Sequence, residues 1–271
     1  MPVPEGHVIH RLAIVTNQHF AGRPVQVSSP QGRFAESAAL LDGRVLSGAE
    51  AWGKHLFITF ETEQPEHIVH IHLGLIGKLW FEPFAAPRGA VRLRITDGET
   101  TADLHGPQTC RLVSVGEQAA QLAKLGPDPI RPDADPEVAW RRVHASNRSI
   151  AALLMDQKIA AGVGNIYRAE VLFRHRVSPD APGRTIDRAL WDMIWADLVE
   201  LMRLGVVDGR IDTVEFAHTP EQMGRSPRID RHGGEVYVYR RAGMPCHVCA
   251  TEIATRVLEG RNLYWCPSCQ R

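Results

Sequence analysis

The chain has 271 residues, of which 44% are apolar and 23% charged, and its 31 basic side chains balance its 31 acidic ones. This composition is that of a globular protein with room for two cores, and zero net charge, taken alone, argues weakly against a nucleic-acid partner. No apolar run reaches the roughly 18 residues that a membrane span needs, and no targeting peptide is recognisable. We therefore expect a cytoplasmic protein that has no contact with a membrane.

The first part of the chain changes from a helical to a strand pattern. Residues 5–19 carry apolar side chains at helical spacing. From about residue 25 to residue 115, short apolar runs such as 56–58 and 91–95 are separated by turn signals of the Asp-Gly type. This pattern predicts a leading helix followed by an antiparallel β-sandwich or barrel.

The second part is predicted to be helical. Residues 126–136 are rich in Pro and Asp and indicate a linker. Helical patterns then cover residues 137–145, 150–157, 165–174 and a longer stretch that includes 190–202. Residues 205–232 have a mixed composition with several prolines, and we expect an irregular, mobile segment there.

Four cysteines near the end of the sequence form two C-x-x-C pairs, Cys246 with Cys249 and Cys266 with Cys269. Each pair places two thiolates on one tight turn, and two facing turns complete a tetrahedral sulfur site for Zn²⁺. A hairpin of about 25 residues cannot fold on its own core, so we expect one structural zinc without an open coordination position. Disulfides are the alternative for these cysteines, whereas Cys110 stands alone and is predicted to be a small buried hydrophobe.

The last 51 residues are locally basic although the whole chain is neutral. Between Glu221 and Arg271 there are eight arginines and five acidic residues, and all the basic residues are Arg. The guanidinium group matches phosphate geometry better than an ammonium does. A phosphate-binding surface and an ordinary solvated surface are both compatible with this feature.

The segment Gly162-Val163-Gly164-Asn165 lies between two helical patterns. Two glycines allow the backbone to approach a ligand closely, and the helix that follows presents unpaired N–H groups and the positive end of its dipole. This combination predicts a phosphate-binding helix start. A tight helix connection without a ligand is the alternative.

Several segments, in chain order, resemble landmarks of the formamidopyrimidine-DNA glycosylase and endonuclease VIII family. They are Pro4-Glu5-Gly6, Gly53-Lys54-His55-Leu56, the segment from His72 to Gly77, Asp156-Gln157-Lys158 with the segment from Gly162 to Glu170, and the segment from Gly260 to Gln270. The resemblance spans the whole chain. It implies an α+β fold with three domains. These are an N-terminal helix and two-layer β-sandwich (1–125), an all-α helix-two-turn-helix domain (126–232) and a β-hairpin zinc finger (233–271).

The resemblance also implies an activity. Family members are bifunctional DNA glycosylases and AP lyases of base excision repair, which remove an oxidised base from damaged double-stranded DNA and nick the abasic site by β,δ-elimination. The opening Pro4-Glu5-Gly6 looks closer to the endonuclease VIII branch, which favours oxidised pyrimidines. From the resemblance as a whole we expect a monomer that works on the bacterial nucleoid. The alternatives are an oxidised-purine glycosylase, a non-catalytic paralogue that binds damaged DNA, and a zinc-ribbon RNA-binding factor.

The family's functional residues have counterparts here. The resemblance implies that Glu5 moves protons at the sugar and that Lys54 lies under the lesion phosphate or base. It further implies that Leu75 is a wedge filling the space left by the extruded base, that Asn165 binds a phosphate beside the lesion, and that Arg261 binds on the other side and assists strand cleavage. Without the family, Glu5 would be interpreted as a helix N-terminal acid, Lys54 as a surface lysine and Leu75 as a core residue.

The nucleophile implied by the family is an N-terminal proline. An α-amino group titrates near ~7.7–8, against ~10.4 for lysine, so it is neutral often enough to form a Schiff base. The sequence opens Met1-Pro2-Val3-Pro4-Glu5, two residues longer than the family's Met-Pro-Glu. Loss of Met1 would expose Pro2, whereas a start at Val3 would expose Pro4 beside Glu5. An acylated proline nitrogen cannot form an iminium, so the nucleophilic proline must be N-terminal. We favour Pro4 as a hypothesis, because Glu5 then follows the nucleophile directly, whereas from Pro2 it lies three residues on.

Overall fold

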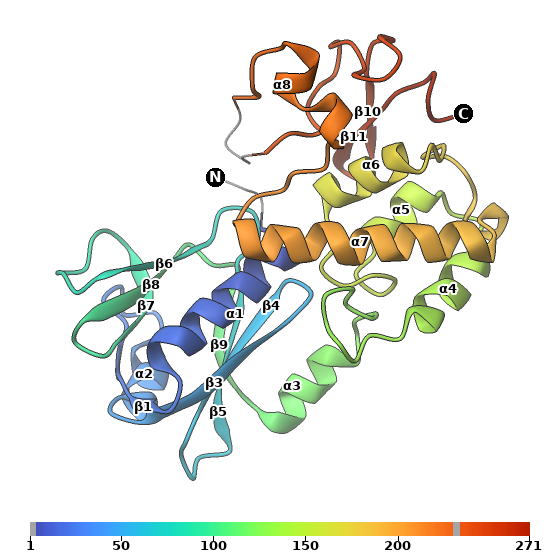
Figure 1. Ribbon diagram of the computed structural model, residues 1–271. Coiled ribbons are helices and arrows are strands. Elements are labelled where there is room, and N and C mark those ends of the chain that lie inside the picture. Colours follow the sequence, from blue (N-terminus) through green and yellow to red (C-terminus); the bar gives the residue numbers. More distant parts are fainter. Residues whose placement is uncertain (1–3, 230–233) are drawn as a thin grey trace. The chain divides into compact units, whose positions relative to one another are not determined.

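The computed structural model describes residues 4–229 and 234–271 (Figure 1). The chain forms two compact units. The sheet unit is Val8–Lys124, and the helical unit combines Leu125–Arg271 with the residues up to His7. Helix α1 (Gly6–Phe20) starts in the helical unit and continues through the sheet unit. Within residues 4–229 and 234–271, none of the helices has the length and apolar character needed to cross a bilayer.

The sheet unit contains two antiparallel sheets, with strand orders β1-β3-β4-β5-β9 and β2-β7-β8-β6. The first sheet is made of β1 (Arg23–Pro24), β3 (Val45–Trp52), β4 (His55–Phe60), β5 (Glu66–His72) and β9 (Thr109–Ser114). The second is made of β2 (Gln26–Ser28), β7 (Val91–Thr96), β8 (Thr100–His105) and β6 (Lys78–Pro83). This arrangement confirms the predicted two-layer β-sandwich behind a leading helix.

One hydrophobic core joins the two sheets and the helix. It includes Phe20 of α1, Leu56 of the first sheet and Leu104 of the second, each at most 1% exposed. Because side chains alternate along a strand, β4 also places Phe57 on the opposite face of the first sheet, where it packs in a smaller cluster with Ile68. The first sheet is therefore covered on both faces.

Two short helices of the sheet unit were not predicted. Helix α2 (Ala35–Leu41) and helix α3 (Val115–Leu122) have seven and eight residues, too few to give a clear helical period. Helix α3 does carry a sequence signal, because Ser114 and Glu117 form a reciprocal capping box at its start. This Ser-x-x-Glu pattern could have identified the helix.

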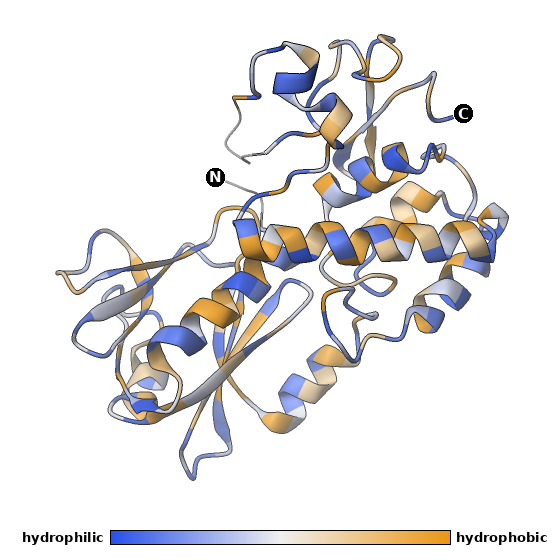
Figure 2. Cartoon of the chain, in the orientation of Figure 1, coloured by the Kyte–Doolittle hydropathy of each residue, from blue (hydrophilic) through white to orange (hydrophobic). Residues whose placement is uncertain are grey.

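The helical unit contains five α-helices, two 3₁₀ turns and one β-hairpin in the part of the chain that is described. They are α4 (Pro136–His144), α5 (Ile150–Met155), α6 (Asn165–Arg174), η1 (Gly183–Thr185), α7 (Arg188–Asp208), η2 (Phe216–His218), α8 (Pro220–Met223), β10 (Ala254–Leu258) and β11 (Arg261–Trp265). The apolar stripe of α7 is visible in Figure 2 and buries Trp191, Ile194 and Leu198, as its helical spacing predicts. The same core contains Tyr264 and Cys266, so the hairpin packs on the helices.

The structure corrects three details of the sequence interpretation. Helix α5 ends at Met155 rather than at residue 157, because Asp156 is already extended. Residues 205–232 are not irregular throughout: α7 continues to Asp208, where Gly209 adopts a positive φ and stops it, and α8 follows. Residues 126–129 are buried, and Gly126 donates to the carbonyl of Gln157 over 2.8 Å, so this part of the expected linker is packed into the helical unit.

Candidate active site and metal centre

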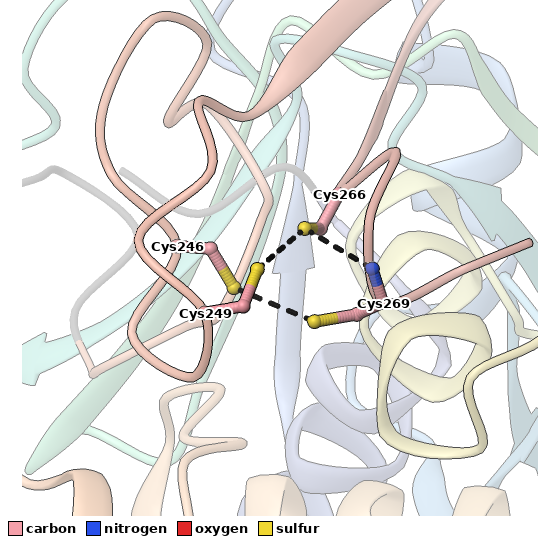
Figure 3. Close-up of side chains that lie close together, drawn as sticks. All are labelled: Cys246, Cys249, Cys266 and Cys269. Atoms are coloured by element: carbon pink, nitrogen blue, oxygen red, sulfur yellow. Dashed lines mark hydrogen bonds between the residues drawn. The ribbon is translucent and has the colours of Figure 1, made fainter.

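The four predicted zinc ligands lie together (Figure 3). The sulfur atoms of Cys246, Cys249, Cys266 and Cys269 are all within 4.8 Å of one another. Tetrahedral coordination with Zn–S bonds of about 2.3 Å separates the sulfurs by about 3.8 Å. The observed separations are 4.0 Å between Cys246 and Cys269 and 3.4 Å between Cys249 and Cys266. Four sulfurs at this spacing fit one structural zinc and leave no position for a substrate.

Neighbouring groups hold this sulfur site in place. The amide of Val248 donates to Cys246 Sγ, and the amide of Cys269 donates to Cys266 Sγ, which favours the thiolate form that binds metal. Gln270 accepts from the amide of Cys266 and donates to the carbonyl of Val177. The turn from Cys266 to Cys269 is therefore joined to the helices of the unit through the buried side chain of Gln270.

Glu170, in the middle of α6, organises the chain that leads to the zinc site. Its carboxylate is fully buried and accepts from the amides of Tyr237, Val238 and Tyr239 over 2.7–2.9 Å and from the hydroxyl of Thr213 over 2.6 Å. Four donors compensate the lost hydration of the carboxylate. Sequence reasoning recorded Glu170 only as part of a motif and missed this role.

Glu5 occupies the N-terminus of α6. It lies directly before α1, is fully buried, and accepts from the amides of Gly164 over 3.1 Å, Ile166 over 2.8 Å and Tyr167 over 3.4 Å. These are the amides that a helix start leaves without partners, and a carboxylate is favourable at that end of the dipole. Pro4, which is half-buried, is fixed beside this contact. Pro2 lies outside the described residues.

The two glycines before α6 serve this internal contact. A Cβ on Gly164 would lie 2.4 Å from Cδ of Glu5, and the amide of Gly6 donates to the carbonyl of Gly162 over 2.8 Å. Three of the amides on which the predicted phosphate-binding helix start relied therefore hold Glu5, and phosphate binding at this helix start stays a prediction. The close backbone approach is made by the start of the chain, and the helix N-terminus already holds a carboxylate.

Asn165 and the hairpin tip that carries Arg261 lie side by side. The turn between β10 and β11 has two residues, Glu259 and Gly260, both with positive φ, as a tight hairpin requires. Arg261 follows it and is exposed. The side-chain amide of Asn165 donates to the carbonyl of Asn262 over 2.9 Å, which joins the start of α6 to the tip.

A second link holds the tip. Arg148 pairs with Glu259 of the turn and with Asp156 after α5, each at 3.0 Å. Because both pairs are largely exposed, each contributes at most about 1 kcal/mol to stability. Their effect is to limit the positions that the tip can adopt.

The other two predicted site residues belong to the sheet unit. Lys54 is half-buried in the two-residue turn between β3 and β4, where Gly53 has a positive φ. Leu75 lies in the turn between β5 and β6 and is 57% exposed, and its neighbour Ile76 is 78% exposed. The alternative interpretation of Leu75 as a core residue was wrong. A wedge role requires this exposure, and that role stays a prediction.

A group of three histidines next to Lys54 was missed by the sequence analysis. His55 and His72 are direct cross-strand partners, and Nδ1 of His55 lies 2.9 Å from Nε2 of His70. Burial, followed by neighbouring positive charges, lowers the pKa of His55 to about 3, and the same causes lower the pKa of His70 to about 4. The two-residue spacing of His70 and His72 on one strand was the available signal.

Comparison with protein-family models covers most of the chain. The formamidopyrimidine-DNA glycosylase N-terminal domain matches residues 3–110, the formamidopyrimidine-DNA glycosylase H2TH domain matches residues 125–216, and the zinc finger found in FPG and IleRS matches residues 243–271. The order of these matches is the order of the sandwich, the helices and the zinc hairpin described above.

Solved structures and curated relatives agree with this match. Lactococcus lactis Fpg in complex with DNA containing an abasic site superposes with a TM-score of 0.80, at 20% identity over 98% of this chain and 99% of that one. Endonuclease 8 1 of Mycobacterium tuberculosis is 50% identical over 99% of this chain and its own full length. Formamidopyrimidine-DNA glycosylase of Thermus thermophilus is 33% identical over 86% of this chain and 85% of its own. The chain belongs to the formamidopyrimidine-DNA glycosylase and endonuclease 8 family.

Removal of zinc should unfold the hairpin and leave the sheet unit folded. Binding of structural zinc in small fingers contributes roughly 10–16 kcal/mol, which the hairpin core cannot replace. We expect Cys249→Ser to lose the single zinc ion, as measured by elemental analysis. Hydrogen exchange should show loss of amide protection in β10 and β11 and retention in β4. Cys110→Ser is the matched control and should keep the zinc; full protection of the hairpin in zinc-free protein would contradict the assignment.

Acid should destabilise the sheet unit through the histidines. His55 and His70 stay neutral in the folded protein, whereas the unfolded chain takes up protons below about pH 6.5. The free energy of unfolding should therefore fall between about pH 6.5 and pH 4, where the unfolded state binds more protons. Replacing both by Asn should flatten this dependence in chemical denaturation, while His67→Asn on the same strand should not. An unchanged slope in the double variant would show that other groups cause it.

Proposed function

We propose that this protein is a bifunctional DNA glycosylase and AP lyase that removes oxidised bases, with pyrimidines preferred, from double-stranded DNA. The observation that carries the proposal is the placement of Pro4 and Glu5 on the N-terminus of α6, within the same unit as Asn165 and the Arg261 tip. It joins the family's candidate catalytic residues to its candidate phosphate-binding residues. The names of the relatives and the DNA complexes of the structural neighbours support the same function.

The proposed reaction starts from a free proline nitrogen. The amine lone pair of Pro4 forms a bond to C1′ of the damaged nucleotide, and the base leaves with the electrons of the N-glycosidic bond and a proton. Opening of the sugar ring gives an iminium, which accepts the electrons released when a C2′ proton is removed. The 3′ phosphate then leaves by β-elimination, and a second elimination releases the 5′ phosphate. Each elimination requires a group that accepts and returns protons beside the sugar.

Glu5 is the proposed proton carrier. Its carboxylate follows the proposed nucleophile directly and is held by amides from Gly164, Ile166 and Tyr167, so it cannot rotate away. A fixed carboxylate adjacent to the amine suits proton transfer at the sugar. The charge of Glu5 is thus used twice, to stabilise the start of α6 and to serve the reaction.

The remaining predicted residues are proposed to hold DNA. Asn165 and Arg261 are suited to phosphates on either side of the lesion, since one offers an amide donor and the other an exposed guanidinium. Lys54 supplies positive charge in the sheet unit, where the adjacent histidines stay neutral at neutral pH. Exposed Leu75 is the proposed wedge, because apolar side chains fill the gap that an extruded base leaves.

The preference for pyrimidines rests on the relative with the greater identity. Endonuclease 8 1 is 50% identical to this chain over its full length, whereas the relatives named formamidopyrimidine-DNA glycosylase are 30–33% identical. The fold is common to both groups and does not separate them. Substrate choice is therefore the finer part of the proposal and needs its own experiment.

Borohydride trapping tests the chemistry and the identity of the nucleophile. We expect the polypeptide that begins at Pro4 to form a covalent adduct with abasic-site DNA under reduction, because its secondary amine is free to form an iminium. The form that begins at Pro2 should bind the same DNA and give at least about tenfold less adduct. Mass spectrometry of the trapped peptide identifies the linked nitrogen. Equal trapping by both forms would assign the nucleophile to Pro2, and binding without trapping by either would indicate a non-catalytic binding protein.

A panel of single-lesion duplexes tests the substrate branch. Duplexes containing 5-hydroxyuracil, thymine glycol, 8-oxoguanine or a formamidopyrimidine, each opposite every normal base, are compared by single-turnover excision rates. We expect the two oxidised pyrimidines to be excised at least about tenfold faster than 8-oxoguanine, a difference of roughly 1.4 kcal/mol in transition-state binding. Faster excision of 8-oxoguanine would place the protein in the purine branch.

A further inference from the structure

Arg168 is a buried cation at the start of α6, in the first turn after Asn165. It has 0% relative exposure and is among the largest fully buried side chains in the described chain. A positive charge is unfavourable at the N-terminal end of a helix dipole, and a buried charge loses its hydration. The position of Arg168 therefore costs free energy of folding, so a compensating role is expected.

The hydrogen bonds that Arg168 makes in the folded protein only partly compensate the cost of burying its charge. Arg168 donates from Nη1 to the carbonyl of Ala151 over 3.4 Å and from Nη2 to Oδ1 of Asn165 and, over 3.5 Å, to the carbonyl of Asn262. All three acceptors are neutral, and the buried Nε–H has no hydrogen-bond partner among the described residues. Burial lowers the pKa of Arg168 to about 10, with Glu5 opposing the shift, so the guanidinium remains charged at neutral pH.

The contact with Asn165 determines which way its amide faces. Guanidinium nitrogens only donate, so the atom that Arg168 contacts must be the amide oxygen. The NH₂ group then faces Asn262, where it donates to the carbonyl over 2.9 Å. A primary amide carries two N–H donors, and this contact uses one of them. Arg168 thus keeps the donor side of Asn165 directed toward the hairpin tip.

We propose that Arg168 is a positioning residue of the phosphate site: it holds Asn165 with its NH₂ group toward a DNA phosphodiester and places a buried positive charge beneath that phosphate. The inference rests on the proposed DNA-binding role of Asn165 and adds a second group to it. Glu5 occupies the amides of Gly164, Ile166 and Tyr167, which leaves fewer backbone donors for a phosphate and gives side chains near Asn165 a larger part in its attraction. Arg168 supplies charge there without being exposed to solvent.

Binding to an uncleavable duplex tests the proposal. The probe is a double-stranded oligonucleotide with one tetrahydrofuran abasic-site analogue, and Kd is measured by fluorescence anisotropy. Because charge-assisted hydrogen bonds are the stronger ones, we expect Arg168→Met to raise Kd about tenfold, and Arg168→Lys, which keeps charge and a donor, to stay within about threefold of wild type. In an Asn165→Ala background, Arg168→Met should raise Kd by about threefold or less, because the orienting role is lost and only the charge of Arg168 remains to act.

Kinetics and stability separate positioning from a purely structural role. On natural abasic-site DNA, Arg168→Met should raise the half-saturating protein concentration while the single-turnover rate at saturation stays within about twofold. Its Tm should change little, because relief of the cost of burying a cation offsets the lost hydrogen bonds and the lost attraction to Glu5. If Arg168→Met unfolds, Arg168→Gln replaces it with the same expectation. A parallel fall of Tm, saturating rate and affinity in the Met, Gln and Lys variants would overturn the proposal.

Two controls keep the outcomes distinct. Arg203→Met removes an equal charge from the exposed side of α7 and should change Kd by less than about twofold. If wild-type protein does not distinguish the tetrahydrofuran duplex from undamaged DNA, the proposed function fails, whatever the variants do. If wild type does distinguish them and Arg168→Met binds equally well, the proposed function stands and the role of Arg168 is refuted.

Discussion

The helical unit depends on the contact between the carboxylate of Glu5 and the start of α6. A helix start presents several amides without partners, and a buried carboxylate is unstable without donors, so each satisfies the other. The contact joins residues about 160 positions apart and requires a glycine at position 164, where a Cβ would collide with the carboxyl. It fixes the beginning of the chain to the helix that carries Asn165. The proposed nucleophile is positioned by the same contact.

A second buried carboxylate gives the same short helix another function. Glu170 holds the backbone of Tyr237, Val238 and Tyr239, from which the chain continues to the zinc site. One helix of ten residues therefore binds the start of the chain at its first turn and, about one turn later, the approach to the zinc hairpin. Because both carboxylates are satisfied by backbone amides, their positions are fixed by geometry and are insensitive to salt.

The overall net charge of the protein is zero, so any electrostatic attraction for a phosphate depends on where individual charged side chains lie. Three amides at the start of α6 are used by Glu5, and the groups proposed to attract a phosphate there are Asn165, Arg168 and Arg261. In the sheet unit, burial keeps the histidines beside Lys54 neutral, which leaves the lysine as the charged group of that turn. Because 31 acidic side chains balance the 31 basic ones, we expect weak binding to undamaged DNA and an affinity that depends on the lesion.

The zinc ligands, the succession of sandwich, helices and zinc hairpin, and the family could be recognised from the sequence, because each depends on short motifs whose residues lie close together in the chain. Each C-x-x-C pair places two sulfurs on one turn, so two pairs specify a four-sulfur site. Helix α7 is long enough for its helical spacing of apolar residues to be recognised from the sequence. Short helices such as α3 were not predicted, because eight residues are too few to show a clear helical periodicity.

Contacts between distant residues were decided only by the tertiary structure. Glycines 162 and 164 have the same sequence signature whether they admit a phosphate or a carboxylate, and the fold selected Glu5. Nothing local distinguishes Arg168 from a solvated helix arginine, since its burial results from α5 and the hairpin packing over it. Residue spacing predicts which side chains share one turn or one helix face. It does not predict which distant residue accepts hydrogen bonds from the amides at a helix start, because that depends on the tertiary fold.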